Sequence, residues 1–190
     1  MRSAKGGQFE REFCRTLSLW YSKGELDDIF WRTSNSGGRA TVRRKNNART
    51  FGQQGDVQAV DPIGAPLMRH LCFELKRGYS NHSFADALDC TILNAPQDWE
   101  KFMVQSITAA EASHASHWFL VQRRDQRQTF VFFPHALFVT LGVPVKSWPR
   151  PFLMLRARVR GEKKGEIYDV SVCGTTWKNF AQVVDPSVFS

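Results

Sequence analysis

The sequence predicts an α/β fold in which helices and strands alternate. Apolar residues recur at helical spacing near the N-terminus and again over residues 97–113, while short apolar runs bounded by Pro and Gly indicate strands. A chain of 190 residues is long enough for one sizeable core and short for two. We therefore expect a single domain over residues 1–190, with a core over about 5–133 and a C-terminal extension over about 134–190.

The N-terminal segment is predicted to be an amphipathic helix over residues 7 to about 22, because apolar residues share one of its faces. These apolar residues are Phe9, Phe13, Leu17 and Trp20. Gly24 is expected to end the helix, and a short strand is expected at residues 29–31. Residues 33–55 are rich in Gly, Asn, Gln, Ser and Arg and are predicted to be a loop.

Two strands are predicted at residues 56–60 and 71–75. The residues between them, 61–66, contain two prolines and one glycine, which favour a turn. The two strands are therefore expected to pair as an antiparallel hairpin.

The remaining chain continues the mixed order, starting with a helix at residues 97–113. The later predicted elements are strands at 117–123, 129–133, 152–159 and 166–173, and short helices at 134–141 and around Trp177 and Phe180. The last two strands are expected either to extend the sheet or to form an interface.

The charge balance favours a partner that carries phosphates. Lys and Arg number 26 against 18 acidic residues, which gives a formal net charge of +8. A basic protein without such a partner explains the total charge equally well, so the distribution of the charges has to decide.

No segment indicates secretion or membrane insertion. No apolar run approaches the roughly 20 residues of a membrane span, and the N-terminus lacks the apolar stretch of a secretory signal. We therefore expect a cytoplasmic protein with no membrane partner. The four cysteines form no CxxC pair and are expected to be reduced and mostly buried.

The tripeptide Glu74-Leu75-Lys76 is the segment most informative about chemistry. Residues two apart in a strand share a face, so Glu74 and Lys76 point together while Leu75 faces the core. If the two predicted strands pair about their turn, Asp56 lies opposite Glu74. Two adjacent carboxylates repel unless a cation joins them, and oxygen ligands favour Mg²⁺. The alternatives are a solvated strand edge for the tripeptide and a turn residue for Asp56.

Gly55-Asp56 followed by Glu74-Leu75-Lys76 resembles the motif of the PD-(D/E)XK nuclease superfamily. Residues 5–13, KGGQFEREF, are similar to the KGxxxERE opening of archaeal-type Holliday junction resolvases, and residues 32–38, RTSNSGG, resemble their Arg-Ser-x-x-Ser type segment. The resemblance covers about residues 5–133. It implies a restriction-endonuclease-like fold, with a mixed central β-sheet flanked by helices and extra C-terminal strands.

The resemblance also implies a role for each matching residue. Asp56 and Glu74 would be the direct metal ligands, and the backbone carbonyl of Leu75 would be an additional ligand. Lys76 would orient or activate water, and Glu10 would be the helix carboxylate that approaches the metal. The expected cofactor is Mg²⁺, for which Mn²⁺ can substitute.

Glu12 competes with Glu10 for the position near the metal. Glu10 follows Phe9 at the edge of the buried stripe, whereas Glu12 lies on the flank between Arg11 and Arg15, so Glu10 is preferred. Acidic residues that suit the dipole of a helix N-terminus are the alternative explanation for both.

The predicted loop is expected to bind DNA phosphates. No acidic residue occurs from Ile29 to Gly55, while this stretch carries six Lys and Arg residues. Neutralising phosphates releases counterions and gives an affinity that does not depend on base sequence. A solvated loop is the alternative. The candidate DNA-binding residues are Arg32, Ser34, Ser36, Arg39, Arg43, Arg44, Lys45 and Arg49.

These observations together predict a Mg²⁺-dependent DNA endonuclease, and the N-terminal motif slightly favours branched or junction DNA. The alternatives are a restriction-like endonuclease, a genome-processing nuclease of a phage or mobile element, and a DNA-binding module that does not cleave. An RNA-directed nuclease is disfavoured because no aromatic stacking motif stands out. A homodimer would suit the cutting of two strands, and the aromatic C-terminal segment would suit either an interface or core packing.

Overall fold

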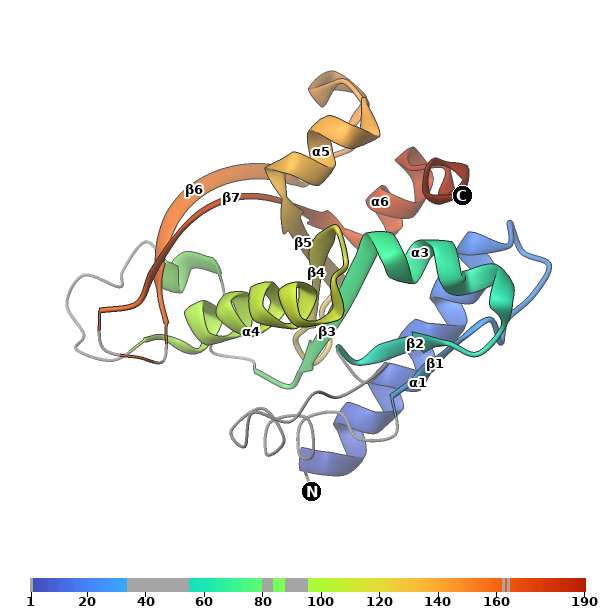
Figure 1. Ribbon diagram of the computed structural model, residues 1–190, viewed down its shortest axis with the longest axis horizontal. Coiled ribbons are helices and arrows are strands. Elements are labelled where there is room, and N and C mark those ends of the chain that lie inside the picture. Colours follow the sequence, from blue (N-terminus) through green and yellow to red (C-terminus); the bar gives the residue numbers. More distant parts are fainter. Residues whose placement is uncertain (1, 34–54, 80–83, 88–95, 162, 164) are drawn as a thin grey trace.

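The chain folds around a five-stranded β-sheet with helices on both faces (Figure 1). The computed structural model describes residues 2–33, 55–79, 84–87, 96–161, 163 and 165–190. The sheet strands are β3 (Leu71–Arg77), β4 (His117–Arg123), β5 (Thr129–Pro134), β6 (Phe152–Arg160) and β7 (Ile167–Thr176). They lie in the order β3-β4-β5-β7-β6, with β3 parallel to β4 and the other neighbours antiparallel. The fold is therefore α/β with a mixed central sheet, as predicted.

The remaining elements lie around this sheet. The helices are α1 (Arg2–Tyr21), α3 (Ala65–His70), α4 (Asp98–Ser113), α5 (His135–Leu141) and α6 (Trp177–Val183). A separate two-stranded antiparallel ladder consists of β1 (Phe30–Arg32) and β2 (Val57–Ala59). Short 3₁₀ helices are η1 (Pro62–Gly64), η2 (Phe84–Ala87), η4 (Val145–Ser147) and η5 (Pro186–Phe189).

The sheet separates two hydrophobic cores, because successive side chains of a strand point to opposite faces. On β3, Phe73 and Leu75 face the core that α1, α3, α5 and α6 cover, whereas Cys72 faces the core that α4 covers. The predicted apolar stripe of α1 is buried in the first core, with Phe9, Phe13 and Leu17 at most 3% exposed. The helix begins at Arg2 rather than at residue 7, so the low helix propensity of two adjacent glycines did not delay its start.

The predicted antiparallel hairpin of residues 56–60 and 71–75 is wrong. β2 pairs with β1, and β3 pairs in parallel with β4. The segment predicted to be a turn forms η1, which the Asp61 side chain caps, and then α3, which buries Leu67 completely. The turn residues therefore start a helix, because Leu67 belongs to the core.

The C-terminal strands extend the sheet, one of the two arrangements expected for them. β7 pairs with β5 on one side and with the whole of β6 on the other. The two strands curve together over the side of the sheet that carries α4 (Figure 1). The fully buried carboxylate of Glu100 on α4 pairs with the Arg160 guanidinium of β6, Oε2 to Nη2, at 2.7 Å. This ion pair fixes the β6–β7 pair against α4.

The cysteines that the structure describes are thiols inside the protein. Cys14, Cys72 and Cys173 are free and buried, as expected, and Cys90 lies outside the described residues. None of the helices in the described part of the chain is long and apolar enough to cross a membrane.

Candidate active site

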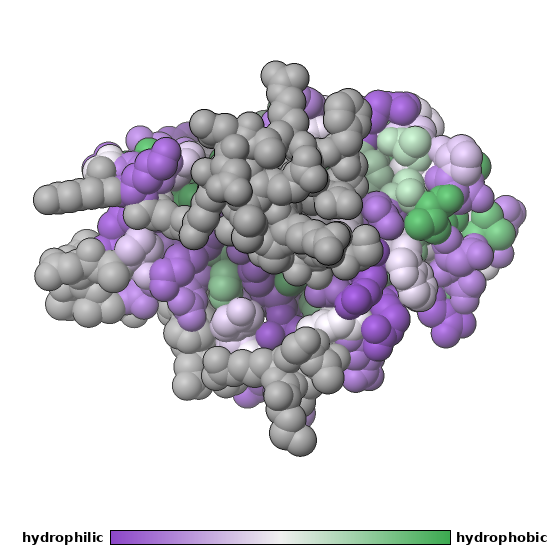
Figure 2. Space-filling view, turned by 60° about the horizontal axis from the view of Figure 1, so that its bottom comes forward, coloured by the Kyte–Doolittle hydropathy of each residue, from purple (hydrophilic) through white to green (hydrophobic). Residues whose placement is uncertain are grey.

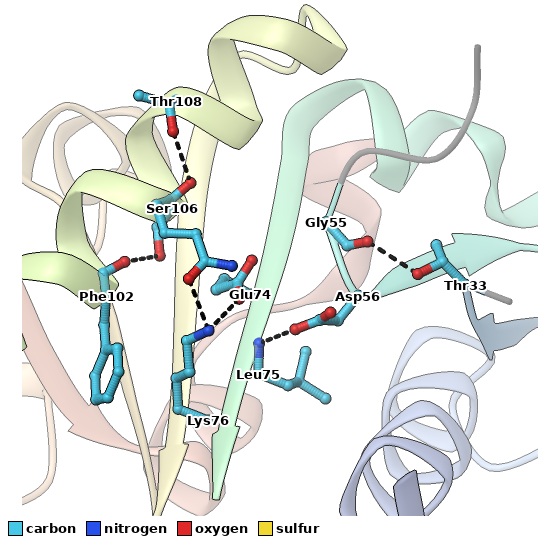
Figure 3. A network of polar contacts seen from close by, with 10 residues as sticks. Thr33, Gly55, Asp56, Glu74, Leu75, Lys76, Phe102, Ser106 and Thr108 are labelled. Carbon is cyan, nitrogen blue, oxygen red and sulfur yellow. Dashed lines mark hydrogen bonds and ion pairs between the residues drawn. The ribbon is translucent and has the colours of Figure 1, made fainter. Parts of the chain in front are cut away.

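β3 presents Glu74 and Lys76 on the face of the sheet that α4 covers. Leu75, between them, packs into the opposite core. Glu74 Oε1 accepts a hydrogen bond from Lys76 Nζ at 2.6 Å (Figure 3). The exposed fractions of the Glu74 and Lys76 side chains are only 4% and 13%, so they form a largely buried ion pair.

Asp56 contacts the outer edge of β3, although its segment does not pair with β3 as the predicted hairpin. Its backbone N–H donates to the Phe73 carbonyl at 2.8 Å, and its side-chain Oδ2 accepts from the backbone N–H of Leu75 at 2.8 Å. From the other side, the Thr33 N–H donates to the Asp56 carbonyl at 3.0 Å. Asp56 is therefore held between the end of β1 and the middle of β3 (Figure 3). The carboxylates of Asp56 and Glu74 become neighbours in this way and not through the predicted hairpin.

Gly55 allows the chain to come this close to β3. Its φ is +75°, a conformation that glycine adopts without steric cost. A Cβ atom at this position would lie 2.7 Å from the Phe73 carbonyl oxygen and 2.9 Å from Cys72 Sγ. The Thr33 hydroxyl donates to the Gly55 carbonyl at 3.0 Å and steadies the bend. The Gly55-Asp56 pair therefore works as a unit, because the glycine permits the contact through which the aspartate reaches β3.

The electrostatics of the site disfavour a charged Asp56 in the absence of a cation. Burial and the neighbouring Glu74 carboxylate raise the pKa of Asp56 from 3.8 to about 7, against the opposing effects of the Leu75 N–H and Lys76. Burial alone would lower the pKa of Lys76, but the charge and hydrogen bond of Glu74 outweigh it, so the pKa of Lys76 is raised. Lys76 offsets part of the negative charge, and a divalent cation would offset the rest.

The donor atoms present fit a hard cation such as Mg²⁺. Phe73 and Leu75 direct a carbonyl and an N–H, respectively, to Asp56, and a strand residue points its N–H and C=O to the same edge in a parallel ladder. The Leu75 carbonyl therefore faces the Asp56 side, and its role as a metal ligand stays a prediction. Within the described residues, no group of three or more His, Cys, Asp and Glu side chains is arranged to hold a metal. The candidate ligands are two carboxylates and one carbonyl, an all-oxygen set with room for waters.

The structure places Glu10 and Glu12 in different surroundings. Glu10 is largely buried and pairs with Arg32, Oε2 to Nη1, at 3.1 Å. Burial raises the pKa of the Cys14 thiol to about 12, and the charges of Glu10 and Asp56 add to this effect, so both carboxylates lie near Cys14. Glu12 instead pairs with Arg123. Glu10 thus lies on the Asp56 side of α1, but a salt bridge holds it there, and its role at a metal stays a prediction.

Sequence reasoning missed Gln105, which lies on α4. Its side-chain Oε1 accepts a hydrogen bond from Lys76 Nζ at 2.9 Å, and Lys76 Nζ also lies 5.3 Å from the centre of the Phe102 ring. Gln105 and Glu74 together fix the direction of the ammonium. No signal in the sequence links a helix residue 29 positions away to the lysine, so only the fold could identify this positioning residue.

Replacing Gln105 by Leu is expected to lower kcat about tenfold or more and to leave KM nearly unchanged. A hydrogen bond to a charged group contributes about 1.5–3 kcal/mol, and its loss would let the Lys76 ammonium swing away. The basic limb of the pH–rate profile should also move to lower pH. Gln105→Glu keeps the acceptor and should restore most of the rate. An unchanged profile for Gln105→Leu would show that Gln105 has no part in positioning Lys76.

Replacing Asp56 by Asn is expected to stabilise the metal-free protein at pH 8. With its pKa raised from 3.8 to about 7, the folded state keeps a proton that the unfolded state loses, so wild-type stability falls as the pH rises through this window. At 1.36 kcal/mol per pKa unit, the loss is at most about 4 kcal/mol. Asn stays neutral and keeps an oxygen for the Leu75 N–H. Thermal unfolding in EDTA should show a higher Tm for the variant at pH 8 and similar values near pH 4. Equal Tm values at pH 8 would contradict this electrostatic account.

The predicted DNA-binding loop falls almost entirely outside the described residues. Those positions are Ser34, Ser36, Arg39, Arg43, Arg44, Lys45 and Arg49. Arg32 is described, and it pairs with Glu10. In the view of Figure 2, the described residues are mainly hydrophilic, with a hydrophobic group at the right.

A mixed sheet with an aspartate at its edge strand and an (Asp/Glu)-x-Lys tripeptide on that strand defines a restriction-endonuclease-like protein. A protein-family profile described as "phage putative PDDEXK endonuclease" matches residues 1–190. The chain belongs to this family and is therefore a nuclease of the PD-(D/E)XK superfamily. The match includes residues 134–190, so the C-terminal strands are part of what the family shares. No curated protein and no solved structure gave a significant match.

Proposed function

We propose that the protein is a divalent-metal-dependent endonuclease that hydrolyses phosphodiester bonds of DNA. The observation that carries the proposal is the buried pair of carboxylates, Asp56 and Glu74, beside the Leu75 carbonyl and the Lys76 ammonium. Mg²⁺ suits these oxygen donors, and Mn²⁺ accepts the same ligand types. When bound there, such a metal supplies a lower pKa for its water and screens the charge of the phosphate.

Lys76 adds a fixed positive charge to this centre. Because its pKa is raised, its amine stays protonated at neutral pH and can donate hydrogen bonds but cannot accept a proton. Glu74 and Gln105 occupy two of its three N–H donors. Among the described residues the third has no hydrogen-bond partner, so it can orient water or a phosphate oxygen. Lys76 would therefore stabilise the negative charge that develops in the transition state. Glu10 would approach the metal from α1 after release from Arg32.

The preferred substrate that we propose is branched or junction DNA of a phage or mobile element. The phage description of the family supports genome processing, and the resolvase-like N-terminal segment supports branched substrates. The net charge of +8 supports a polyanion as partner. Cutting both strands would need two centres, which a homodimer in the cytoplasm would provide.

The proposal is tested by incubating the purified protein with linear duplex, supercoiled plasmid, four-way junction and single-stranded DNA. Each substrate is tried with Mg²⁺, with Mn²⁺ and with EDTA, and Asp56→Asn serves as the inactive control. We expect cleavage with either metal, none with EDTA, and the fastest cleavage on the junction. Binding without cleavage under every condition would instead support a DNA-binding module without catalysis, and equal rates on all substrates would exclude junction preference.

Neutralising Arg43, Arg44 and Lys45 together is expected to weaken DNA binding alike on all sequences. Each lost phosphate contact lowers the slope of log K against log salt by about 0.9 on duplex DNA, so three contacts would change it by about 3. Affinities of several duplexes and one four-way junction across a salt series measure this slope. An unchanged slope would mean that the loop is only solvated, and a loss limited to junctions would mean that it recognises branching.

A further inference from the structure

Two arginines lie side by side where β3 and β4 end, on the face of the sheet opposite to the carboxylate–lysine pair. Arg77 and Arg123 are register partners in the parallel ladder. Phe73 and Leu75 precede Arg77 at two-residue intervals and face the α1 core, so Arg77 points to the same side. The Arg123 guanidinium confirms this side independently, because its carbon lies 4.6 Å from the centre of the Phe9 ring on α1.

The guanidinium of Arg77 has N–H groups that the described part of the chain does not satisfy. Its Nε and Nη1 are buried and have no hydrogen-bond partner among the residues that the structure describes. The carboxylate that it pairs with, Asp125 Oδ1, is 3.7 Å from Nε and too distant for a hydrogen bond. Leaving a buried donor unsatisfied costs about 1–3 kcal/mol, and more for a charged group. A cost of this kind requires an explanation other than packing.

The other arginine of the pair has a carboxylate partner. Glu12 on α1 binds Arg123, and this hydrogen bond is the main cause of the lowered pKa of Glu12. Glu12 is thus engaged with the neighbouring arginine, although the charge of Arg77 also acts on it. The side chain of Arg77 is 19% exposed, so one end of it reaches solvent. Within the described residues, Arg77 Nε and Nη1 have no acceptor, and an anion from solution can supply one.

We propose that Arg77 binds a backbone phosphate of the DNA strand close to the cleavage centre. A guanidinium presents paired N–H donors that match phosphate oxygens. A bound phosphate would attract the guanidinium toward the solvent-exposed end of the side chain. It would then accept charge-assisted hydrogen bonds from the N–H groups that lack a partner among the described residues. Arg77 lies three residues after Glu74, about 10 Å along the backbone of β3. The identity of the ligand as DNA rests on the proposed function, whereas the need for an anion rests on Arg77 itself.

The test compares Arg77→Ala with Arg15→Ala, both in an Asp56→Asn background in EDTA so that no DNA is cut. Arg15 is an exposed α1 residue that pairs with Asp27, and its removal takes away the same charge. Affinity for one duplex is measured across a salt series. Arg77→Ala should weaken binding about tenfold and lower the slope of log K against log salt by about 0.9, whereas Arg15→Ala should change neither. Thermal unfolding should give Arg77→Ala a Tm no lower than that of its parent.

Equal slopes for the two variants would overturn the proposal. If Arg77→Ala does not fold, Arg77→Lys decides, because it keeps the charge without the paired donors and should show an affinity below that of the parent. A parental affinity for Arg77→Lys would then count against the site. Since no step of this test requires cleavage, a loss of slope here, together with no cleavage of any substrate by the wild-type protein, would leave the phosphate site standing and the nuclease proposal refuted.

Discussion

Glu74→Gln is expected to abolish metal-dependent DNA cleavage while the protein remains folded. The Glu74 residue is 3% exposed, and its carboxylate is one of the two that form the candidate centre. Gln keeps the size of the side chain and removes the charge that would hold the cation. Because the metal contributes several kcal/mol of transition-state stabilisation, we expect a loss of at least about 1,000-fold in kcat. Nicking of supercoiled plasmid in Mg²⁺ measures the effect.

The matched control for this variant is Glu111→Gln, an exposed position on α4 that also loses one carboxylate. It should cleave at the wild-type rate. Far-UV circular dichroism and thermal unfolding verify that Glu74→Gln keeps its fold, since the change leaves Lys76 without its ion-pair partner. Cleavage by folded Glu74→Gln at a rate near that of the control would rule Glu74 out as part of the centre.

Lys76→Met is expected to lose cleavage almost completely and to keep its affinity for metal and DNA. The ammonium is held near the carboxylates by two acceptors, so it acts on charge that develops in the transition state more than on the bound substrate. Met preserves the apolar stem that packs near Phe102. Loss of one such donor in an active site costs about 100- to 1,000-fold in kcat.

Separate measurements of binding and rate decide the role of Lys76. DNA affinity is measured in EDTA, and the rate is measured at saturating DNA in Mg²⁺. A variant that loses affinity and rate in equal proportion would identify Lys76 as a phosphate contact only. Retained affinity with a collapsed kcat supports the role that we propose.

Sequence patterns predicted best the helices and strands whose apolar residues follow a regular pattern. The α1 stripe and α4 follow from helical periodicity, and the four later strands follow from apolar runs bounded by turn residues. The hairpin prediction was wrong because turn residues mark where a chain bends and do not determine the structure of the segment that follows. That segment is a helix whose Leu67 is fully buried in the first core, among residues remote in sequence.

The sequence predicted the part of the site that lies within one strand. It could not predict the contacts that form only when separate elements pack together. Glu74 and Lys76 share a face by strand geometry, and the sequence predicted this. Asp56 was singled out as a site residue, which stays a prediction, and its contact with β3 depends on Gly55 and the Thr33 hydrogen bonds rather than on a ladder. Gln105 could not be foreseen, because its relation to Lys76 exists only after α4 packs on the sheet.

Direct binding of Mn²⁺, followed by electron paramagnetic resonance, tests most directly whether Asp56 and Glu74 hold a divalent metal. Free Mn²⁺ is titrated with wild-type protein, with Asp56→Asn and with Glu111→Gln, and Mg²⁺ is then added as a competitor. We predict that wild-type protein and Glu111→Gln bind Mn²⁺ and release it to Mg²⁺, and that Asp56→Asn binds it at least about tenfold more weakly. Equal Mn²⁺ affinity of all three proteins would contradict the assignment of the metal to this pair of carboxylates.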